Sequence, residues 1–301
     1  AMYTLPLGSF TMGAQSSALA EFAGGIGNFF GSIFGGSSGE EYSGRDSEVP
    51  AHAVSVDSWI AISRAEISVG QFRRFVQNTD YRTDAELHGF SYAIINDEEL
   101  RVSGKNWRHD FRGAPAADEL PVVHVSHRDA EAFARWLSAR TGASYRLPSE
   151  SEFEYAARAG VTELTPWGSG APPDGAGNFR GEGDPLPPGW DIDNKRVKPV
   201  SDYADGAFGP VARGASNAND FGLESMLGNV AEWTADCFNR DYSSKGSSQR
   251  TRTDGECGRR IVRGTDWSTD ARRLRLSYRE ARPATYSSNT IGFRVARDVN
   301  R

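Results

Sequence analysis

Regular helix signals are scarce in this sequence, and their scarcity constrains the fold more than any other feature. The 301 residues include 33 glycines and 7 tryptophans. Glycine destabilises helices and strands when it lies in their interiors, whereas large aromatic side chains can anchor irregular backbone to a core. We therefore expect most of the chain to be irregular backbone that aromatic side chains hold in place.

Three segments nevertheless carry a strong helix signal. Ser68, Ser126 and Ser149 each stand before an apolar helical pattern, and each is followed three residues later by Gln, Asp or Glu. This arrangement is typical of a capping box, which starts a helix. It predicts helices that begin after these serines and end near residues 78, 142 and 160. Short strands are predicted at 10–13, 53–60, 122–125, 231–238, 260–264 and 292–297.

Charge and hydropathy exclude two classes of protein. The chain has 40 acidic and 34 basic residues and a net charge of -6, so no net field favours nucleic acid. No apolar run is long enough to span a membrane, and the first residues, AMYTLPLG, lack the features of a signal peptide. We expect neither nucleic-acid binding nor a membrane span, and the sequence leaves the cell compartment open.

Residues 14–46 form a distinct segment that is rich in Gly and Ser. The segment also contains six large apolar residues: Phe22, Ile26, Phe29, Phe30, Ile33 and Phe34. A purely flexible linker would not carry such residues. Two interpretations remain: an ordered surface loop that packs on its own domain, or a hairpin that contacts a partner or a membrane surface.

Several motifs occur in an order that resembles one known family. RLPSESEFEYAAR is followed by GNVAEW and then by a terminal GFR. Their order resembles that of the formylglycine-generating enzyme family, or sulfatase-modifying-factor domain, whose fold is a variant of the C-type lectin fold. The resemblance covers nearly the whole chain except 14–46. It implies one α+β domain over 1–301, of low regular secondary structure, with short antiparallel strands and about three helices.

The resemblance also implies cation sites. GNVAEW offers two backbone carbonyls and one carboxylate, which are hard oxygen ligands suited to calcium. Family members bind calcium at the positions that correspond to Ser225, Gly228, Val230 and Glu232, although the family usually has Asn or Asp where this chain has Ser225. A second family site resembles Asn178 and Phe179 with a later aspartate, either Asp193 or Asp191. A structural Ca²⁺ at these positions is therefore an expectation.

Copper chemistry is not expected. The enzyme that names the family oxidises a substrate cysteine with copper held by two thiolates. In this chain the corresponding positions carry Thr269 and Leu274, which cannot bind Cu(I). Cys237 and Cys257 lie upstream, and we expect either a disulfide across the 238–256 excursion or two buried free thiols.

Residues 263–294 alternate apolar anchors with short runs of small or polar residues. The anchors are Trp267, Leu274, Ile291 and Phe293. The pattern resembles the variable region of the variable proteins made by diversity-generating retroelements, in which a C-type lectin fold displays diversified side chains. It predicts a ligand-binding surface that comprises Thr265, Asp266, Ser268, Thr269, Asp270, Arg273, Ser277, Tyr278, Thr285, Tyr286, Ser288 and Asn289.

Two functions are compatible with these patterns. We favour a non-catalytic protein that binds a small-molecule or protein ligand through residues 265–290. The alternative is a cysteine-independent oxidoreductase, like a branch of the family thought to oxidise a siderophore precursor, with Glu280 as a base. A binding surface of this kind should be shallow and exposed, whereas an enzyme should place a perturbed acid or base in a deep pocket.

Overall fold

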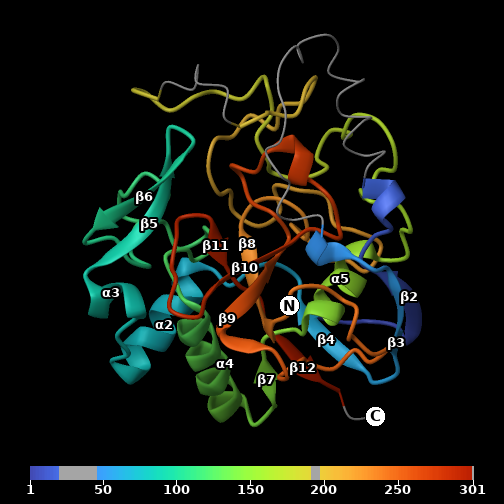
Figure 1. Ribbon diagram of the computed structural model, residues 1–301. Coiled ribbons are helices and arrows are strands. Elements are labelled where there is room, and N and C mark those ends of the chain that lie inside the picture. The colour runs from blue at the N-terminus through green and yellow to red at the C-terminus, as the bar shows by residue number, and fades with distance from the viewer. Residues whose placement is uncertain (20–45, 191–196, 300–301) are drawn as a thin grey trace.

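The computed structural model describes residues 1–19, 46–190 and 197–299 (Figure 1). The helices are α2 (Val69–Thr79), α3 (Asp84–His88), α4 (His127–Thr141) and α5 (Glu150–Arg158), with the 3-10 turns η1 (Asp46–Glu48) and η2 (Ala271–Arg273). The strands are β1 (Met2–Thr4), β2 (Gly8–Met12), β3 (His52–Val56), β4 (Ile60–Ser63), β5 (Phe90–Ile95), β6 (Glu98–Ser103), β7 (Tyr145–Arg146), β8 (Ala231–Phe238), β9 (Glu256–Arg263), β10 (Arg279–Pro283), β11 (Ile291–Gly292) and β12 (Ala296–Asp298). Most of 14–46 lies outside the described residues, so neither interpretation of it is tested.

The three predicted helices are confirmed as α2, α4 and α5. Each begins at the expected serine, whose side chain accepts a hydrogen bond from the third residue of the helix. The third side chain accepts in return from the backbone N–H of the serine, so each capping box is complete. The short helix α3 was not predicted, because its 5 residues are too few for an apolar period to emerge.

Short strands form two four-stranded sheets and two separate ribbons. One sheet has the order β1-β4-β12-β7 and the other β10-β9-β8-β11, while β2 pairs with β3 and β5 with β6. All pairings are antiparallel except that of β11 with β8. The α+β class with short antiparallel strands is therefore confirmed.

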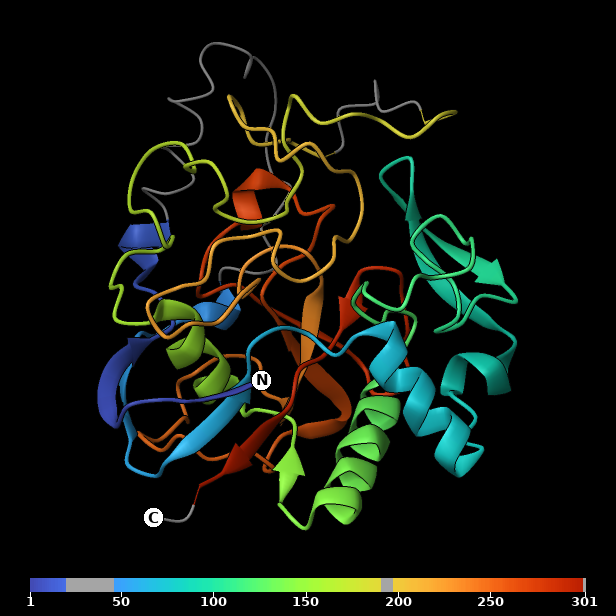
Figure 2. The same cartoon turned by 180° about the vertical axis from the view of Figure 1, so that it is seen from behind.

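The sheet that contains β8 and β9 lies between two helical elements. Both views place α5 on one side of these strands and α4, with α2 beside it, on the other (Figures 1 and 2). The described parts of the long loops between α5 and β8 gather at one end of the molecule, uppermost in Figure 1. No helix in the described ranges is both long and apolar enough to cross a membrane.

Three of the strand predictions require correction. Residues 122–125 form no strand, because His124 adopts a left-handed backbone with φ of 59° and its N–H donates to the carbonyl of Ser288. The predicted strand at 53–60 divides into β3 and β4, and the one at 292–297 divides into β11 and β12. An alternating apolar pattern continues through a bend and so cannot reveal where the hydrogen-bonded ladder stops.

Aromatic side chains hold the core together, as the composition indicates. Phe72 packs against Phe133 with ring centroids 6.0 Å apart and against Trp107 at 5.5 Å. Phe133 in turn contacts Phe293 at 5.4 Å, which joins the GFR motif to α2 and α4. The four anchors of 263–294 are all buried, and Trp267 is 2% exposed.

The two cysteines form a disulfide, so the alternative of two free thiols is wrong. Cys237 in β8 and Cys257 in β9 are joined across a sequence separation of 20 residues. The bridge therefore closes the excursion between two neighbouring strands at the place where their pairing becomes irregular.

Candidate functional site

The first residues of β8 hold a buried ion pair where calcium was expected. Both carboxylate oxygens of Glu232 accept hydrogen bonds from Arg294, from Nε and Nη2, each at 2.7 Å. Both side chains are fully buried. Arg294 also donates to the carbonyls of Ser63 at 3.1 Å and Glu224 at 3.0 Å. The one carboxylate of the ligand set predicted at this loop is therefore already paired with a cationic side chain.

The residues predicted as calcium ligands at this loop do not fit the ion in this arrangement. A calcium ion needs six to eight oxygen ligands, whereas the carboxylate of Glu232 is already engaged in two charge-assisted hydrogen bonds. The Ser225 hydroxyl lies 3.3 Å from that of Ser216 and supplies no charge. Across the described ranges, no group of three or more His, Cys, Asp or Glu side chains could hold a metal ion. Calcium at Ser225, Gly228, Val230 and Glu232 would require Arg294 to move away.

The second predicted cation site contains a carboxylate that the sequence did not reveal. Asp191 and Asp193 lie outside the described residues. Instead the N–H of Phe179 donates to Oδ2 of Asp205 at 3.1 Å, while the side-chain amide of Asn178 donates to the carbonyl of Gly209. Burial raises the pKa of Asp205 to about 6. No spacing signal pointed to Asp205, because the loop before it has no pattern that aligns.

Most of the predicted surface residues are not on the surface. Eight of the twelve are buried: Thr265, Thr269, Asp270, Ser277, Tyr278, Tyr286, Ser288 and Asn289. Several of them bond to distant parts of the scaffold, as Ser277 does through its hydroxyl to Glu48 at 2.7 Å. Tyr286 stacks on Tyr92 with centroids 4.8 Å apart. The expectation of a shallow, exposed face is therefore wrong for these positions.

Seven of the twelve predicted residues line one cavity of about 370 Å³. These are Thr265, Asp266, Ser268, Thr269, Asp270, Arg273 and Tyr278. Other polar residues that line it include Glu99, Glu280 and Arg282. We call this space the 263–291 cavity. The structure thus brings together about half of the predicted set and places Ser277, Thr285, Tyr286, Ser288 and Asn289 outside this lining.

Asp266 and Glu280 are two of the carboxylates that line the 263–291 cavity. Burial raises the pKa of Asp266, and the negative charge of Glu280 adds to this effect. Oδ1 of Asp266 accepts hydrogen bonds from the N–H of Ser268 at 2.8 Å and from its hydroxyl at 2.6 Å. Glu280 forms an ion pair with Arg282, which also contacts Glu99 at 3.1 Å. The cavity thus contains hydrogen-bond acceptors, and burial raises the pKa of one of its carboxyl groups, that of Asp266.

The two positions that correspond to the copper-binding cysteines of the family face different spaces. Thr269 lines the 263–291 cavity, and its hydroxyl accepts a hydrogen bond from the N–H of Asp266 at 2.9 Å. Leu274 lies in an apolar cluster with Phe179 and lines another cavity. Neither side chain is a ligand for Cu(I), so the residues present do not fit copper.

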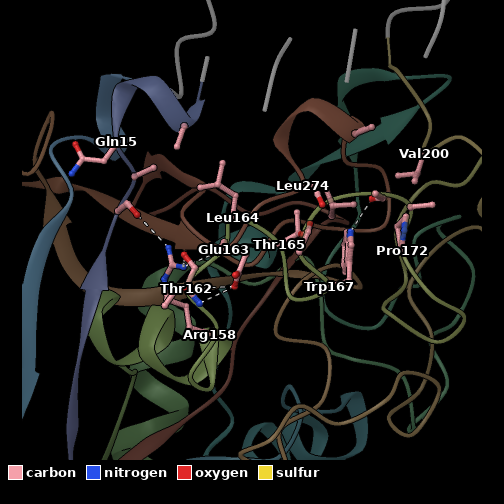
Figure 3. A pocket seen from close by; sticks show the side chains of 18 of the residues that line it. Gln15, Arg158, Thr162, Glu163, Leu164, Thr165, Trp167, Pro172, Val200 and Leu274 are labelled. Carbon is pink, nitrogen blue, oxygen red and sulfur yellow. Dashed lines mark hydrogen bonds between the residues drawn. The ribbon is translucent and has the colours of Figure 1, made fainter. Parts of the chain in front are cut away.

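That other cavity is larger, about 670 Å³, but its chemistry is less suited to catalysis (Figure 3). Its walls include Leu164, Trp167 and Leu274. The polar groups there bond to the protein itself: Arg158 donates to Glu154 at 2.9 Å, and the indole N–H of Trp167 donates to the carbonyl of Gly170. The 263–291 cavity is therefore the better candidate site.

Comparisons with known proteins agree with this architecture. A family model described as the sulfatase-modifying factor enzyme 1-like domain matches residues 1–299. The chain is 31% identical over 287 residues to the Bos taurus protein named inactive C-alpha-formylglycine-generating enzyme 2, with 86% of this chain and 83% of that protein covered. It is similar to the solved structure of PvdO from Pseudomonas aeruginosa, with a TM-score of 0.66, 26% identity, and 99% of this chain and 94% of the other covered. Treponema denticola variable protein 1 shares the fold, with a TM-score of 0.59, 17% identity, and 99% and 95% of the two chains covered. The chain therefore belongs to the sulfatase-modifying factor enzyme 1-like family, with its variant of the C-type lectin fold.

Proposed function

We propose that this protein binds a small polar ligand in the 263–291 cavity and does so without copper. One observation carries the proposal: residues selected from a sequence pattern alone, spread over 265–278, converge on one cavity of about 370 Å³. A cavity of this size falls within the range that small-molecule sites occupy.

A small ligand suits this site better than a protein partner. A partner that docks by surface contact reaches exposed side chains, but eight of the twelve predicted positions are buried. Of the seven predicted residues that line the cavity, Arg273 is exposed and Asp266 and Ser268 are half-buried. A ligand small enough to enter the cavity can reach the buried groups behind them.

The carboxylates of the lining suit a ligand group that donates hydrogen bonds, while Arg263, Arg272, Arg273 and Arg282 line the same cavity. Asp266 and Glu280 both line the cavity, and carboxylates are acceptors when ionised. Burial raises the pKa of Asp266, the charge of Glu280 adds to this effect, and a ligand donor that bonds to the carboxylate would favour its charged form. We therefore expect ligand binding to lower the pKa of Asp266 and to favour its ionised form.

The test is a screen of small polar molecules by thermal shift, followed by calorimetric titration of each hit. Glu280→Gln and Asp266→Asn should each weaken binding of a hit by about tenfold, since each removes a charge-assisted hydrogen bond. Glu119→Gln, which changes an exposed carboxylate elsewhere, is the matched control. Hits that bind both cavity variants as tightly as the wild type would refute the proposal.

A second candidate function is cysteine-independent oxidation in the same cavity. The observation that favours it is that Asp266 and Glu280 line one cavity and that burial, with the charge of Glu280 as a further cause, raises the pKa of Asp266, as is common for catalytic acids and bases. Mass spectrometry of each bound ligand after aerobic incubation would detect an oxidised product. Turnover that Glu280→Gln abolishes while binding persists would favour the enzyme, and unchanged ligand would favour the binding protein.

The retroelement interpretation has its own test at the level of the gene. The interpretation requires a near-duplicate of the coding segment for 263–294 and a reverse transcriptase in the gene's neighbourhood. Ser277 and Tyr286 are buried and contact distant parts of the scaffold, so we expect the residue type at these two positions not to vary. Sequence variants from related strains should therefore differ at Asp266, Ser268 or Arg273 before they differ at these two.

A further inference from the structure

A second cavity, of about 480 Å³, lies beside the first at the edge strand β10. The two cavities share Arg273, Tyr278, Glu280 and Arg282 in their linings. The second cavity is lined by five arginines: Arg240, Arg259, Arg273, Arg279 and Arg282. We call it the arginine cavity. Glu280 is the one acidic residue that lines it, in a chain whose net charge is -6.

We propose that the arginine cavity binds an oxyanion, namely the phosphate, sulfate or carboxylate group of a small molecule. Guanidinium groups match such anions because their planar N–H donors form paired, charge-assisted hydrogen bonds. This proposal goes beyond the ligand of the 263–291 cavity and does not depend on it.

Arg279 forms a rigid wall of the cavity. Its Nε and Nη2 donate to the two carboxylate oxygens of Glu150 at 2.6 and 3.0 Å, and its Nη1 donates to the carbonyls of Ser47 and Asn239. Because these donors are already used, Arg279 supports the site without holding the anion itself. Arg282 is similarly engaged with Glu280.

Three arginines retain donors for a ligand. The guanidinium of Arg259 stacks over the ring of Phe238, with its central carbon 4.2 Å from the ring centroid. A carboxylate oxygen of Glu256 lies 4.0 Å from a nitrogen of Arg259. Arg240 and Arg273 are exposed, and no carboxylate in the described ranges forms an ion pair with either of them. Each guanidinium carries five N–H donors, so these side chains offer many more donors than the described residues accept.

The arginine cavity is large enough for a small organic molecule that carries an anionic group, and also for a free inorganic anion. Inorganic phosphate fills only part of a cavity of about 480 Å³. Phosphate, sulfate and a dicarboxylate such as malonate therefore make three arms of one experiment, since all present oxyanions but differ in size and in charge. Tighter binding of malonate than of phosphate would identify the carboxylate as the source, and the reverse order would identify the phosphoryl group.

The experiment titrates each anion into the full chain at constant ionic strength, adjusted with sodium chloride. We expect saturable calorimetric binding and a matching rise of the melting temperature. The double variant Arg240→Gln with Arg259→Gln should weaken binding by about tenfold or more, since it removes two charged donors. Both side chains reach solvent, so the variant should fold, and circular dichroism checks this.

Arg128→Gln is the matched control, because Arg128 is an exposed arginine on α4 that lines neither cavity. It should leave the affinity for the anion unchanged. Two results would overturn the proposal: absence of saturable binding by the wild-type chain, or an equal loss of affinity in Arg128→Gln and in the double variant. Neither result depends on a ligand in the 263–291 cavity, so the two proposals fail separately.

Discussion

Glu66 should make the stability of this protein depend on pH in an unusual direction. Its side chain is buried at 7% exposure, and Oε1 accepts one hydrogen bond from the amide of Asn229 at 2.9 Å. Burial is the main cause that raises its pKa to about 7, and the neighbouring Glu232 adds to it, against the attraction of Arg294. A carboxyl of this kind is more easily protonated in the folded than in the unfolded chain.

Proton linkage gives the direction in which stability changes with pH. Since the folded-state pKa lies above the ordinary value of 4.5, the folded chain holds more protons than the unfolded chain between these two values. The stabilising contribution of Glu66 is therefore complete below pH 4.5 and is lost as the pH rises through about 7. One pKa unit corresponds to ~1.4 kcal/mol, so the total loss is on the order of 3 kcal/mol.

Glu66→Gln isolates this contribution, because glutamine stays neutral and its oxygen can still accept from Asn229. We expect the variant to be more stable than the wild type at pH 8, by up to the order of 3 kcal/mol, and to lose that advantage at pH 4.5. Urea denaturation of both proteins at several pH values, with the disulfide intact, measures the difference. Titrating groups that do not interact electrostatically with Glu66 cancel in this difference, among them His124 and His127, whose pKa values burial lowers to about 3.

The control is Glu119→Gln, an exposed carboxylate whose removal should not alter the pH profile. The reasoning would be refuted if Glu66→Gln and the wild type differed by the same free energy of unfolding at pH 4.5 and pH 8. A larger advantage of the variant at the lower pH would refute it as well.

The remaining predictions concern the ion pair, the anchors, the bridge and copper. Since Arg294 donates to both carboxylate oxygens of Glu232, a chelator should leave the melting temperature of the wild type unchanged. Glu232→Ala should lower the free energy of unfolding by about 3–5 kcal/mol, because it leaves the buried charge of Arg294 unpaired. A melting temperature that falls with chelator and returns with calcium would contradict the first expectation. Trp267→Ala should cost about 3–5 kcal/mol in urea denaturation because the indole is buried, and a loss below ~1 kcal/mol would show that the indole is no anchor. Replacing Cys237 and Cys257 by serine should lower stability by about 3 kcal/mol. Equal denaturation midpoints would argue against a structural bridge. Anaerobic titration of the wild type should show no stoichiometric uptake of Cu(I), and uptake of one equivalent would overturn the copper argument.

Local features of this protein were predictable from its sequence. The capping boxes at Ser68, Ser126 and Ser149 start helices because the partners of each hydrogen bond lie three residues apart. Thr269 and Leu274 exclude thiolate chemistry whatever their surroundings. The burial of the Trp267 anchor also followed from its type and position, since a large apolar side chain is rarely left in water.

The tertiary structure decided which polar side chains are buried and what they bind. Ser277 has a polar partner in Glu48, which is 229 residues away, and Glu232 meets Arg294 at a separation of 62 residues. A polar residue in a short polar run looks the same in sequence whether it faces solvent or a distant buried charge. Burial of a polar group is tolerated only where a partner exists, and here the fold alone brings the partner within reach.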